Sequence, residues 1–143
     1  MSTYLVRHYM DTSIASTEGN IDVVDAAKQM STAGKGYLII LDRGHPTGIV
    51  TDSDLVKKVL AAEKDPKKVL IKDIMSTPLI TTDPDEDLVA ASELLKKHDI
   101  KQAPAVKGGI IYGVLTTEGI SKQFVDYLDR SSRDIMRWCN VLG

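Results

Sequence analysis

The residues best suited to chemistry lie in one short stretch, Gly48 to Leu55. Thr51, Ser53 and Asp54 bring two hydroxyls and a carboxylate together, directly after the β-branched pair Ile49-Val50. A helix-like sequence follows them. A strand that runs straight into a helix gathers backbone N–H groups, hydroxyls and carboxylates at one point. Such a junction can hold a phosphate at the helix N-terminus and a sugar diol on a carboxylate.

The same stretch has a purely structural interpretation. Thr51 followed three residues later by Asp54 is also the pattern of a capping box, with Thr51 as N-cap and Asp54 at the third helical position. Short motifs of this kind are often only helix caps. The stretch by itself therefore leaves both interpretations open.

Composition sets the class of protein. The chain has 143 residues, 43% hydrophobic and 27% charged, enough for an ordinary core in one domain or two small ones. The net charge of −2 disfavours nucleic acid as a partner. Cys139 is the only cysteine and the three histidines are scattered, so we expect no disulfide and no metal site. No leader or membrane-spanning run is recognised, which favours a cytoplasmic protein without membrane contact.

The stretch occurs twice, because the chain contains an internal repeat. Adding 65 to each residue number aligns residues 6–60 with 71–125 without a gap. Ten of the 55 aligned positions are identical, among them Met10/Met75, Gly48/Gly113 and Thr51/Thr116.

Each repeat is predicted to form a strand, a helix, two strands and a second helix. The first strands are expected at Ile14–Ser16 and Leu79–Thr81, with Asn20 and Asp85 as N-caps of the helices that follow. The second strands are expected at Tyr37–Leu41 and Ala103–Val106, followed by hairpin loops at Arg43–Pro46 and Lys107–Gly109. The third strands are expected to end at Thr51 and Thr116.

A unit of this size cannot bury both faces of its sheet alone. We therefore expect an α+β or α/β fold in which two repeats pack around a pseudo-two-fold axis, followed by a C-terminal helix. The predicted divisions are a first repeat at 1–65, a linker near 63–70, a second repeat at 66–128 and a helical tail at 129–143.

With these residues in view, the chain resembles a tandem pair of CBS domains, also called a Bateman module. The resemblance rests on two sets of motifs at one offset: Met10 to Ile14 and Gly48 to Asp54 in the first repeat, and Met75 to Leu79, His98 to Val106 and Gly113 to Gly119 in the second. It covers residues 6–125.

The resemblance implies a non-catalytic regulatory module. Such pairs bind adenosine-bearing ligands (AMP, ADP, ATP or S-adenosylmethionine) in clefts between the repeats and signal to a separate effector protein. No obligatory cofactor is implied, although magnesium can accompany a nucleotide. Carried onto this sequence, the ligand site would comprise Ile14, Ala15, Ile49, Thr51, Ser53 and Asp54, with Lys101 and Gln102 from the second repeat.

The second repeat departs from the family pattern. Gly119 stands where the first repeat has Asp54, and Glu118 where it has Ser53. A carboxylate at position 118 is unfavourable beside a phosphate. We therefore expect one competent cleft and one weaker cleft, the latter lined by Gly36, Tyr37, Leu79, Ile80 and Thr116. Tyr37 has an alternative interpretation as an ordinary strand residue.

The tail predicts an assembly. Apolar residues from Phe124 to Leu142, including Trp138, recur at helical spacing and form a seam that needs a partner. A homodimer is the favoured arrangement. The alternatives for function are a ligand-free dimerising scaffold or a module dedicated to S-adenosylmethionine.

Overall fold

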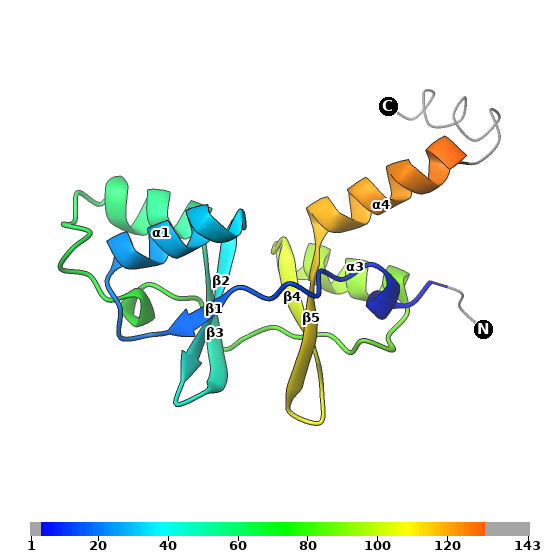
Figure 1. Cartoon of the computed structure of the whole chain (residues 1–143), viewed down its shortest axis with the longest axis horizontal. Coiled ribbons are helices and arrows are strands. Elements are labelled where there is room, and N and C mark those ends of the chain that lie inside the picture. The colour runs from blue at the N-terminus through cyan, green and yellow to red at the C-terminus, as the bar shows by residue number, and fades with distance from the viewer. Residues whose placement is uncertain (1–3, 131–143) are drawn as a thin grey trace. The chain divides into compact units, whose positions relative to one another are not determined.

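The computed structural model describes residues 4–130, with side chains as far as Gln123. The elements in chain order are η1 (Val6–His8), β1 (Ser16–Glu18), α1 (Val23–Ala33), β2 (Tyr37–Asp42), β3 (His45–Thr51), α2 (Asp52–Leu55), η2 (Val56–Leu60), η3 (Ile71–Asp73), α3 (Leu88–Lys97), β4 (Gln102–Lys107), β5 (Ile110–Thr116) and α4 (Thr117–Arg130) (Figure 1). The elements η1 and η3 are separate 3₁₀ turns, and the π-helical η2 continues directly from α2.

The hairpins of the two repeats follow the prediction closely. β2 pairs with β3, and β4 with β5, both antiparallel. Each loop has two residues, and all four have positive φ: 51° at Arg43, 81° at Gly44, 59° at Gly108 and 77° at Gly109. Positive φ at both central residues defines the type I′ turn, whose twist matches that of the strands it joins. The predicted buried strands and the ends of β3 and β5 are confirmed.

The first strand of each repeat is displaced from its predicted position. β1 covers Ser16–Glu18 instead of Ile14–Ser16, and it runs parallel to β2. Leu79–Thr81 forms no strand, and Thr82 makes a single parallel bridge to Ala105. The predictions were wrong here because short edge strands are defined by the neighbour they pair with, which no local pattern specifies.

The first helices also start later than predicted. Asp22 caps α1 by accepting from the Asp25 amide at 2.8 Å, and Asp87 caps α3 by accepting from the Ala90 amide at 3.3 Å. The predicted caps at Asn20 and Asp85 were two residues early. Backbone pairing explains the delay in both repeats. The preceding residues 19–21 and 84–86 form turns and bends. These are held by the bonds Ile71 N–Ile21 O (2.8 Å), Lys72 N–Gly19 O (3.1 Å), Val6 N–Glu86 O (3.0 Å) and Arg7 N–Pro84 O (2.8 Å).

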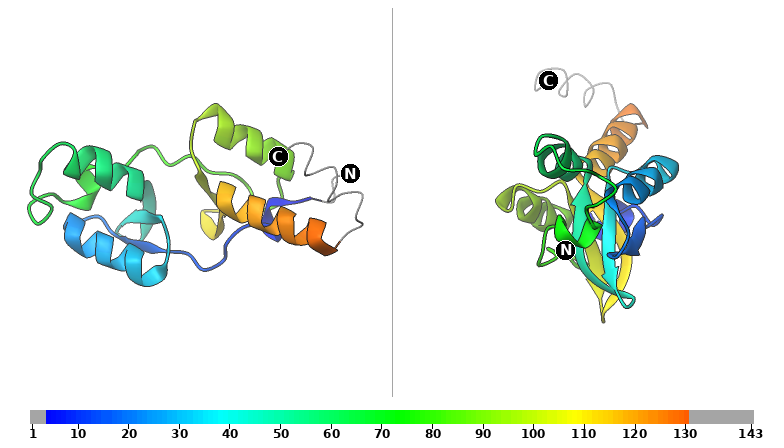
Figure 2. Two further views of the ribbon diagram at one scale, coloured as in Figure 1. Left: turned by 90° about the horizontal axis from the view of Figure 1, so that it is seen from above. Right: turned by 90° about the vertical axis from the view of Figure 1, so that its left-hand side faces the viewer.

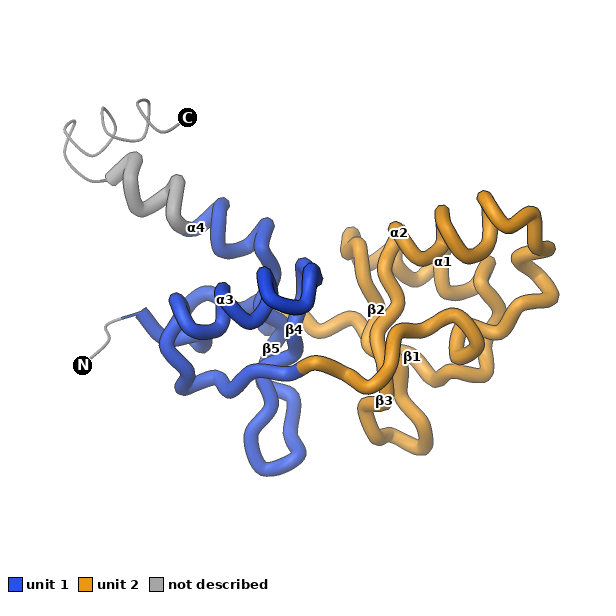
Figure 3. Tube along the Cα trace, turned by 180° about the vertical axis from the view of Figure 1, so that it is seen from behind, with its two compact units in different colours: residues 1–12, 81–143 blue, residues 13–80 orange. Residues whose placement is uncertain are grey.

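The leading segment of each repeat packs on the other repeat. Two backbone bonds join Ile49 to Ser76, at 3.1 and 2.8 Å, and two join Asp11 to Val114, both at 2.9 Å. Consequently the chain forms two compact units that differ from the sequence repeats: unit 1 comprises residues 1–12 and 81–143, and unit 2 comprises residues 13–80 (Figure 3). The predicted boundary between repeat and tail falls within α4. The apolar seam from Phe124 onward and Cys139 lie outside the described side chains.

This exchange explains two of the identities between the repeats. A methyl group at Gly48 would lie 2.7 Å from the Ser76 carbonyl oxygen and 2.8 Å from the Met75 sulfur. At Gly113 it would lie 2.8 Å from the carbonyl oxygen of Asp11 and 2.8 Å from the Met10 sulfur. Each glycine therefore lets the leading segment of the other repeat approach its strand.

We expect Gly48→Ala to destabilise the chain by about 1–3 kcal/mol, because the new methyl group must displace backbone. Chemical denaturation of the variant, monitored by circular dichroism, would give the value. Gly44→Ala is not a matched control, since Gly44 has a φ of 81°. Ser76→Ala is a suitable one, because it adds no volume and leaves the carbonyl in place. A Gly48→Ala variant as stable as wild type would contradict the close approach.

Each unit has its own hydrophobic core, in which a helix packs its apolar face on the strands. In unit 1, Val6 from the leading segment is fully buried in a cluster with Ala91, Leu95, Ala103, Ala105 and Leu115. In unit 2, α1 buries Val23, Ala26 and Met30, and the strands contribute Leu38, Ile39, Ile40 and Val50. In that unit, α1 lies beside the helical segment 52–60 (Figure 2). This arrangement fixes the strand-to-helix junction at Thr51.

Candidate functional site

The junction between β3 and α2 forms a complete capping box. The Thr51 hydroxyl oxygen accepts from the Asp54 amide at 3.3 Å, and Asp54 Oδ2 accepts from the Thr51 amide at 3.0 Å. The structural interpretation of this stretch is therefore confirmed. It does not exclude a ligand, because a capping carboxylate keeps further acceptor positions.

Lys58 adds a third partner to the Asp54 carboxylate. Its ammonium lies 3.2 Å from Asp54 Oδ1 and also donates to the carbonyl oxygen of Ile74 at 2.8 Å. The Asp54 side chain is only 16% exposed and Lys58 is 42% exposed. The carboxylate is thus held at both oxygens, on Oδ2 by Thr51 and on Oδ1 by Lys58. Sequence analysis missed Lys58, although the spacing of four residues from Asp54 is the signal of a helical ion pair.

The neighbouring polar residues are more open. Ser53 is exposed, and its amide donates to Asp52 Oδ1 at 2.8 Å. The Asp52 amide donates to the Gly36 carbonyl oxygen at 3.0 Å, which ties the start of α2 to the strand opposite. The junction therefore presents two carboxylates and an exposed serine.

The corresponding junction in unit 1 keeps the cap and lacks the charges of Asp54 and Lys58. The Thr116 hydroxyl oxygen accepts from the Gly119 amide at 2.8 Å. Gln123, which occupies the register position of Lys58, donates from Nε2 to the Tyr9 carbonyl oxygen at 3.3 Å. Tyr9 is the register equivalent of Ile74. Each unit thus ties its second helix to a leading segment, and only unit 2 has a carboxylate at the position of Asp54.

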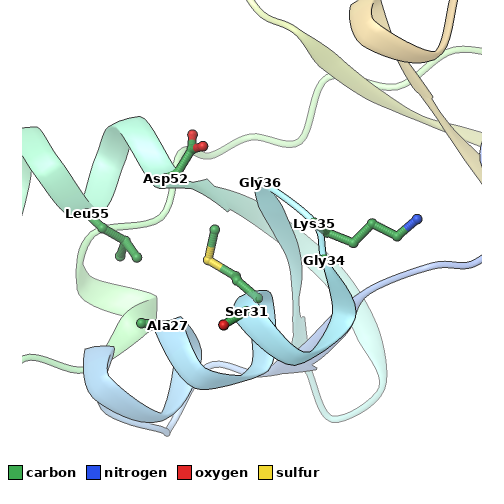
Figure 4. A pocket seen from close by; sticks show the side chains of 8 residues that line it. Ala27, Ser31, Gly34, Lys35, Gly36, Asp52 and Leu55 are labelled. Carbon is green, nitrogen blue, oxygen red and sulfur yellow. The ribbon is translucent and has the colours of Figure 1, made fainter. Parts of the chain in front are cut away.

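A pocket of about 390 Å³ opens next to the junction in unit 2 (Figure 4). Ala27 and Ser31 of α1 face Asp52 and Leu55 of α2 across it, and the loop Gly34–Gly36 closes one end. The Lys35 side chain extends away from Ala27 and Leu55. Gly36, predicted for the weaker cleft, therefore borders a cavity beside the residues predicted for the stronger one.

The predicted ligand residues divide between the two units. Unit 2 holds Ile14, Ala15, Ile49, Thr51, Ser53 and Asp54, together with Gly36, Tyr37, Leu79 and Ile80 from the weaker set; unit 1 holds Lys101, Gln102 and Thr116. Within unit 2, Tyr37 pairs directly with Thr51, so residues assigned to separate clefts are neighbours across two strands. Within unit 1, Gln102 pairs with Thr116.

The apolar residues near the junction differ in exposure. Ala15 is 9% exposed, and Ile14 and Ile49 are half-buried. The Ala15 carbonyl oxygen accepts from the Ile39 amide at 2.9 Å, which fixes this segment along β2. Tyr37 is only 3% exposed, which favours its interpretation as an ordinary strand residue over a stacking platform.

A surface ion network in unit 1 has a structural role. Asp85 pairs with Lys107 and with Arg7, whose Nε lies 2.7 Å from Asp85 Oδ1. Hydrogen bonds from Lys107 and Arg7 lower the pKa of Asp85, and the hydrogen bond with Asp85 raises the pKa of Lys107. The network ties the leading segment at Arg7 to the loop before α3.

Residues 4–130 show neither a metal-type cluster nor a membrane-spanning helix. Within that range no cluster of three or more His, Cys, Asp or Glu side chains has the arrangement of a metal site. The helices described there are too short or too polar to cross a membrane.

The family of the chain follows from this repeated architecture and from comparison. The family model of the CBS domain matches residues 6–61 and 71–126. The chain belongs to the CBS domain family. It is a CBS domain pair, a class of regulatory modules, and the mixed α and β fold predicted from the repeat is confirmed.

Proteins similar to this chain are found both by sequence and by structure. The uncharacterized protein MK0525 of Methanopyrus kandleri is 35% identical over 99 residues, which cover 68% of this chain and 50% of that protein. This CBS pair thus spans about half the length of that relative. The CBS domain pair of protein MJ0100, solved in complex with 5′-methylthioadenosine and S-adenosyl-L-methionine, is 30% identical with a TM-score of 0.75, over 84% of this chain and 98% of that one. The hexameric CBS-CP12 protein from bloom-forming cyanobacteria is 25% identical with a TM-score of 0.79, over 99% of this chain and 89% of that one.

Proposed function

We propose that this CBS pair is a non-catalytic sensor that binds an adenosine-bearing ligand at the β3–α2 junction of unit 2 and signals to a separate effector protein. The observation that carries the proposal is the Asp54 carboxylate, which is held in a fixed position by Thr51 and Lys58 and retains acceptor capacity. A fixed carboxylate next to a short helix is suited to a ribose diol.

The chemistry of the ligand fits the residues around the junction. Ribose hydroxyls would donate to Asp54 in charge-assisted hydrogen bonds, each contributing roughly 1.5–3 kcal/mol. The half-buried Ile14 and Ile49 would provide an apolar wall for the base, with Ala15 behind them. Lys101 and Gln102 remain the residues we propose for the second repeat.

Similarity to a solved CBS domain pair supports an adenosine-bearing compound as the class of ligand. The MJ0100 pair, at 30% identity, was solved with two adenosine derivatives, 5′-methylthioadenosine and S-adenosyl-L-methionine. We therefore include these compounds beside AMP, ADP and ATP, with magnesium for the nucleotides. The weaker cleft, with Gly119 in place of the carboxylate, would contribute little to the total affinity.

A ligand-free dimerising scaffold is the second candidate. The likeness to the hexameric CBS-CP12 protein supports self-association, and the homodimer predicted from the tail stays a prediction. A cytoplasmic location also stays a prediction. Both candidates predict no turnover of ATP, so the presence of a ligand is what separates them.

A thermal-shift panel with AMP, ADP, ATP, 5′-methylthioadenosine, S-adenosylmethionine and NAD tests the proposal. A ligand present at 100 times its dissociation constant should stabilise the folded chain by roughly 2.7 kcal/mol. We expect at least one adenosine compound to raise the melting temperature, and inosine or guanosine analogues at the same concentration serve as controls. If no adenosine compound shifts the transition, the scaffold is the better account.

A further inference from the structure

Lys58 contacts Asp54 at the junction, but the ligand proposal gives it no contact with the ligand itself. Its ammonium makes two contacts with different parts of unit 2: the Asp54 carboxylate at 3.2 Å and the Ile74 carbonyl oxygen at 2.8 Å. Asp54 and Lys58 lie on consecutive turns of the same helical segment. Ile74 follows η3, the 3₁₀ turn that opens the second repeat.

The other repeat supplies an internal comparison. There the second helix carries Gly119 and Gln123 at the positions of Asp54 and Lys58, and Gln123 keeps the bond to its own leading segment at the Tyr9 carbonyl oxygen, 3.3 Å away. The bond to the leading segment therefore needs only a neutral donor. The positive charge is present only where a carboxylate is present.

From this comparison we propose that Lys58 is a positioning residue for the ligand site, which holds the Asp54 carboxylate in place and links it to the leading segment of the second repeat at Ile74. This inference rests on the proposed function. If Lys58 served only to attach the helix, a glutamine would suffice, as Gln123 does in unit 1. An ammonium can donate to both acceptors at once and also attracts the carboxylate by its charge, whereas the NH2 group of a glutamine has two donors and no charge.

The arrangement also gives the site a route to the rest of the chain. A ligand that draws Asp54 Oδ1 toward its hydroxyls competes with the ammonium for that oxygen. Any displacement of Lys58 then changes the contact at Ile74, two residues before the Ser76–Ile49 backbone pair. Occupancy of the junction and the packing of the connecting segment are therefore coupled.

The decisive variant is Lys58→Gln, which copies the arrangement of unit 1. It should retain the bond to the Ile74 carbonyl and lose the ion pair. We expect a melting temperature within a degree or two of wild type, and binding of AMP or S-adenosylmethionine, measured by calorimetry, about two- to fivefold weaker, as for loss of one partly exposed ion pair. Lys58→Arg should bind nearly as tightly as wild type, because it keeps the positive charge that Lys58→Gln removes.

Two further variants separate positioning from a general effect on stability. In an Asp54→Asn background, Lys58→Gln should cause no additional loss of affinity. Gln123→Lys, which adds the ammonium where no carboxylate is present, should leave binding unchanged. The role of Lys58 would be overturned if Lys58→Gln bound as tightly as wild type. It would also be overturned if Lys58→Gln weakened binding by the same factor in the wild-type and Asp54→Asn backgrounds.

The same experiment separates this inference from the proposed function. If wild type binds neither probe, or Asp54→Ala binds as tightly as wild type, the ligand site itself is wrong and the role of Lys58 is lost with it. If Asp54→Ala weakens binding and Lys58→Gln does not, the site stands and only the positioning role is lost.

Discussion

Asp54→Ala is expected to lose nearly all adenosine-ligand binding and little stability. The variant removes one half of the capping box, which should cost about 1 kcal/mol of folding free energy. Losing two charge-assisted hydrogen bonds to ribose should weaken binding by roughly 3–6 kcal/mol, about 150-fold or more. Calorimetry gives the affinity and denaturant unfolding gives the stability of the same preparation.

Thr116→Ala is the matched control for this experiment. Thr116 caps α4 through the Gly119 amide at 2.8 Å, so its loss should cost a similar cap energy in unit 1. Because Gly119 stands at the position of Asp54 in this repeat, we expect the affinity to change little. Near one ligand per chain in wild type agrees with one competent junction. Two equal sites per chain, or full affinity in Asp54→Ala, would contradict the assignment.

Deleting residues 1–12 is expected to unfold unit 1 while unit 2 stays folded. The segment contributes the fully buried Val6 to the core of unit 1 and pairs with Val114 through the backbone of Asp11. Burial of one valine contributes about 1.5–3 kcal/mol, and each backbone bond about 0.5–1.5 kcal/mol. The combined loss is comparable to the whole stability of a small unit, roughly 5–15 kcal/mol.

Hydrogen exchange measured residue by residue would check this expectation. Amides in β4 and β5 should lose protection in the deletion variant, and amides in β2 and β3 should keep most of theirs. Arg7→Ala is the point control, because it removes only an exposed ion pair of the same segment. Full protection of β5 after the deletion would show that the leading segment is dispensable.

The exchange of leading segments links each second helix to the other sequence repeat. The residue after each 3₁₀ turn accepts a bond from the second helix of the unit it completes, Ile74 from Lys58 and Tyr9 from Gln123. Each helix that follows the Thr51 or Thr116 cap is therefore connected to a segment from the other repeat. We expect a change at either junction to reach both sequence repeats through these contacts.

The sequence by itself determined the repeat and the local structure of the hairpins and of the Thr51 junction. The repeat at an offset of 65, the two hairpins, the ends of β3 and β5 and the capping box at Thr51 and Asp54 were all predicted from periodicity, turn residues and caps. These features depend on contacts within a few residues, and such contacts are written in the local pattern. The asymmetry of Asp54 and Gly119 is likewise a fact of the sequence.

Only the tertiary structure decided which segments complete each unit. Met10 and Met75, like Gly48 and Gly113, are alike in the two repeats, so a leading segment could satisfy its own repeat or the other with the same local chemistry. The exchanged pairs Ile49–Ser76 and Asp11–Val114 are long-range backbone contacts that no local pattern encodes. Other long-range backbone bonds, from Ile71 and Lys72 to residues 19–21 and from Val6 and Arg7 to residues 84–86, accompany the shift of the helix caps to Asp22 and Asp87. The repeat thus defined two equivalent sets of partners, and the packing of the whole chain selected between them.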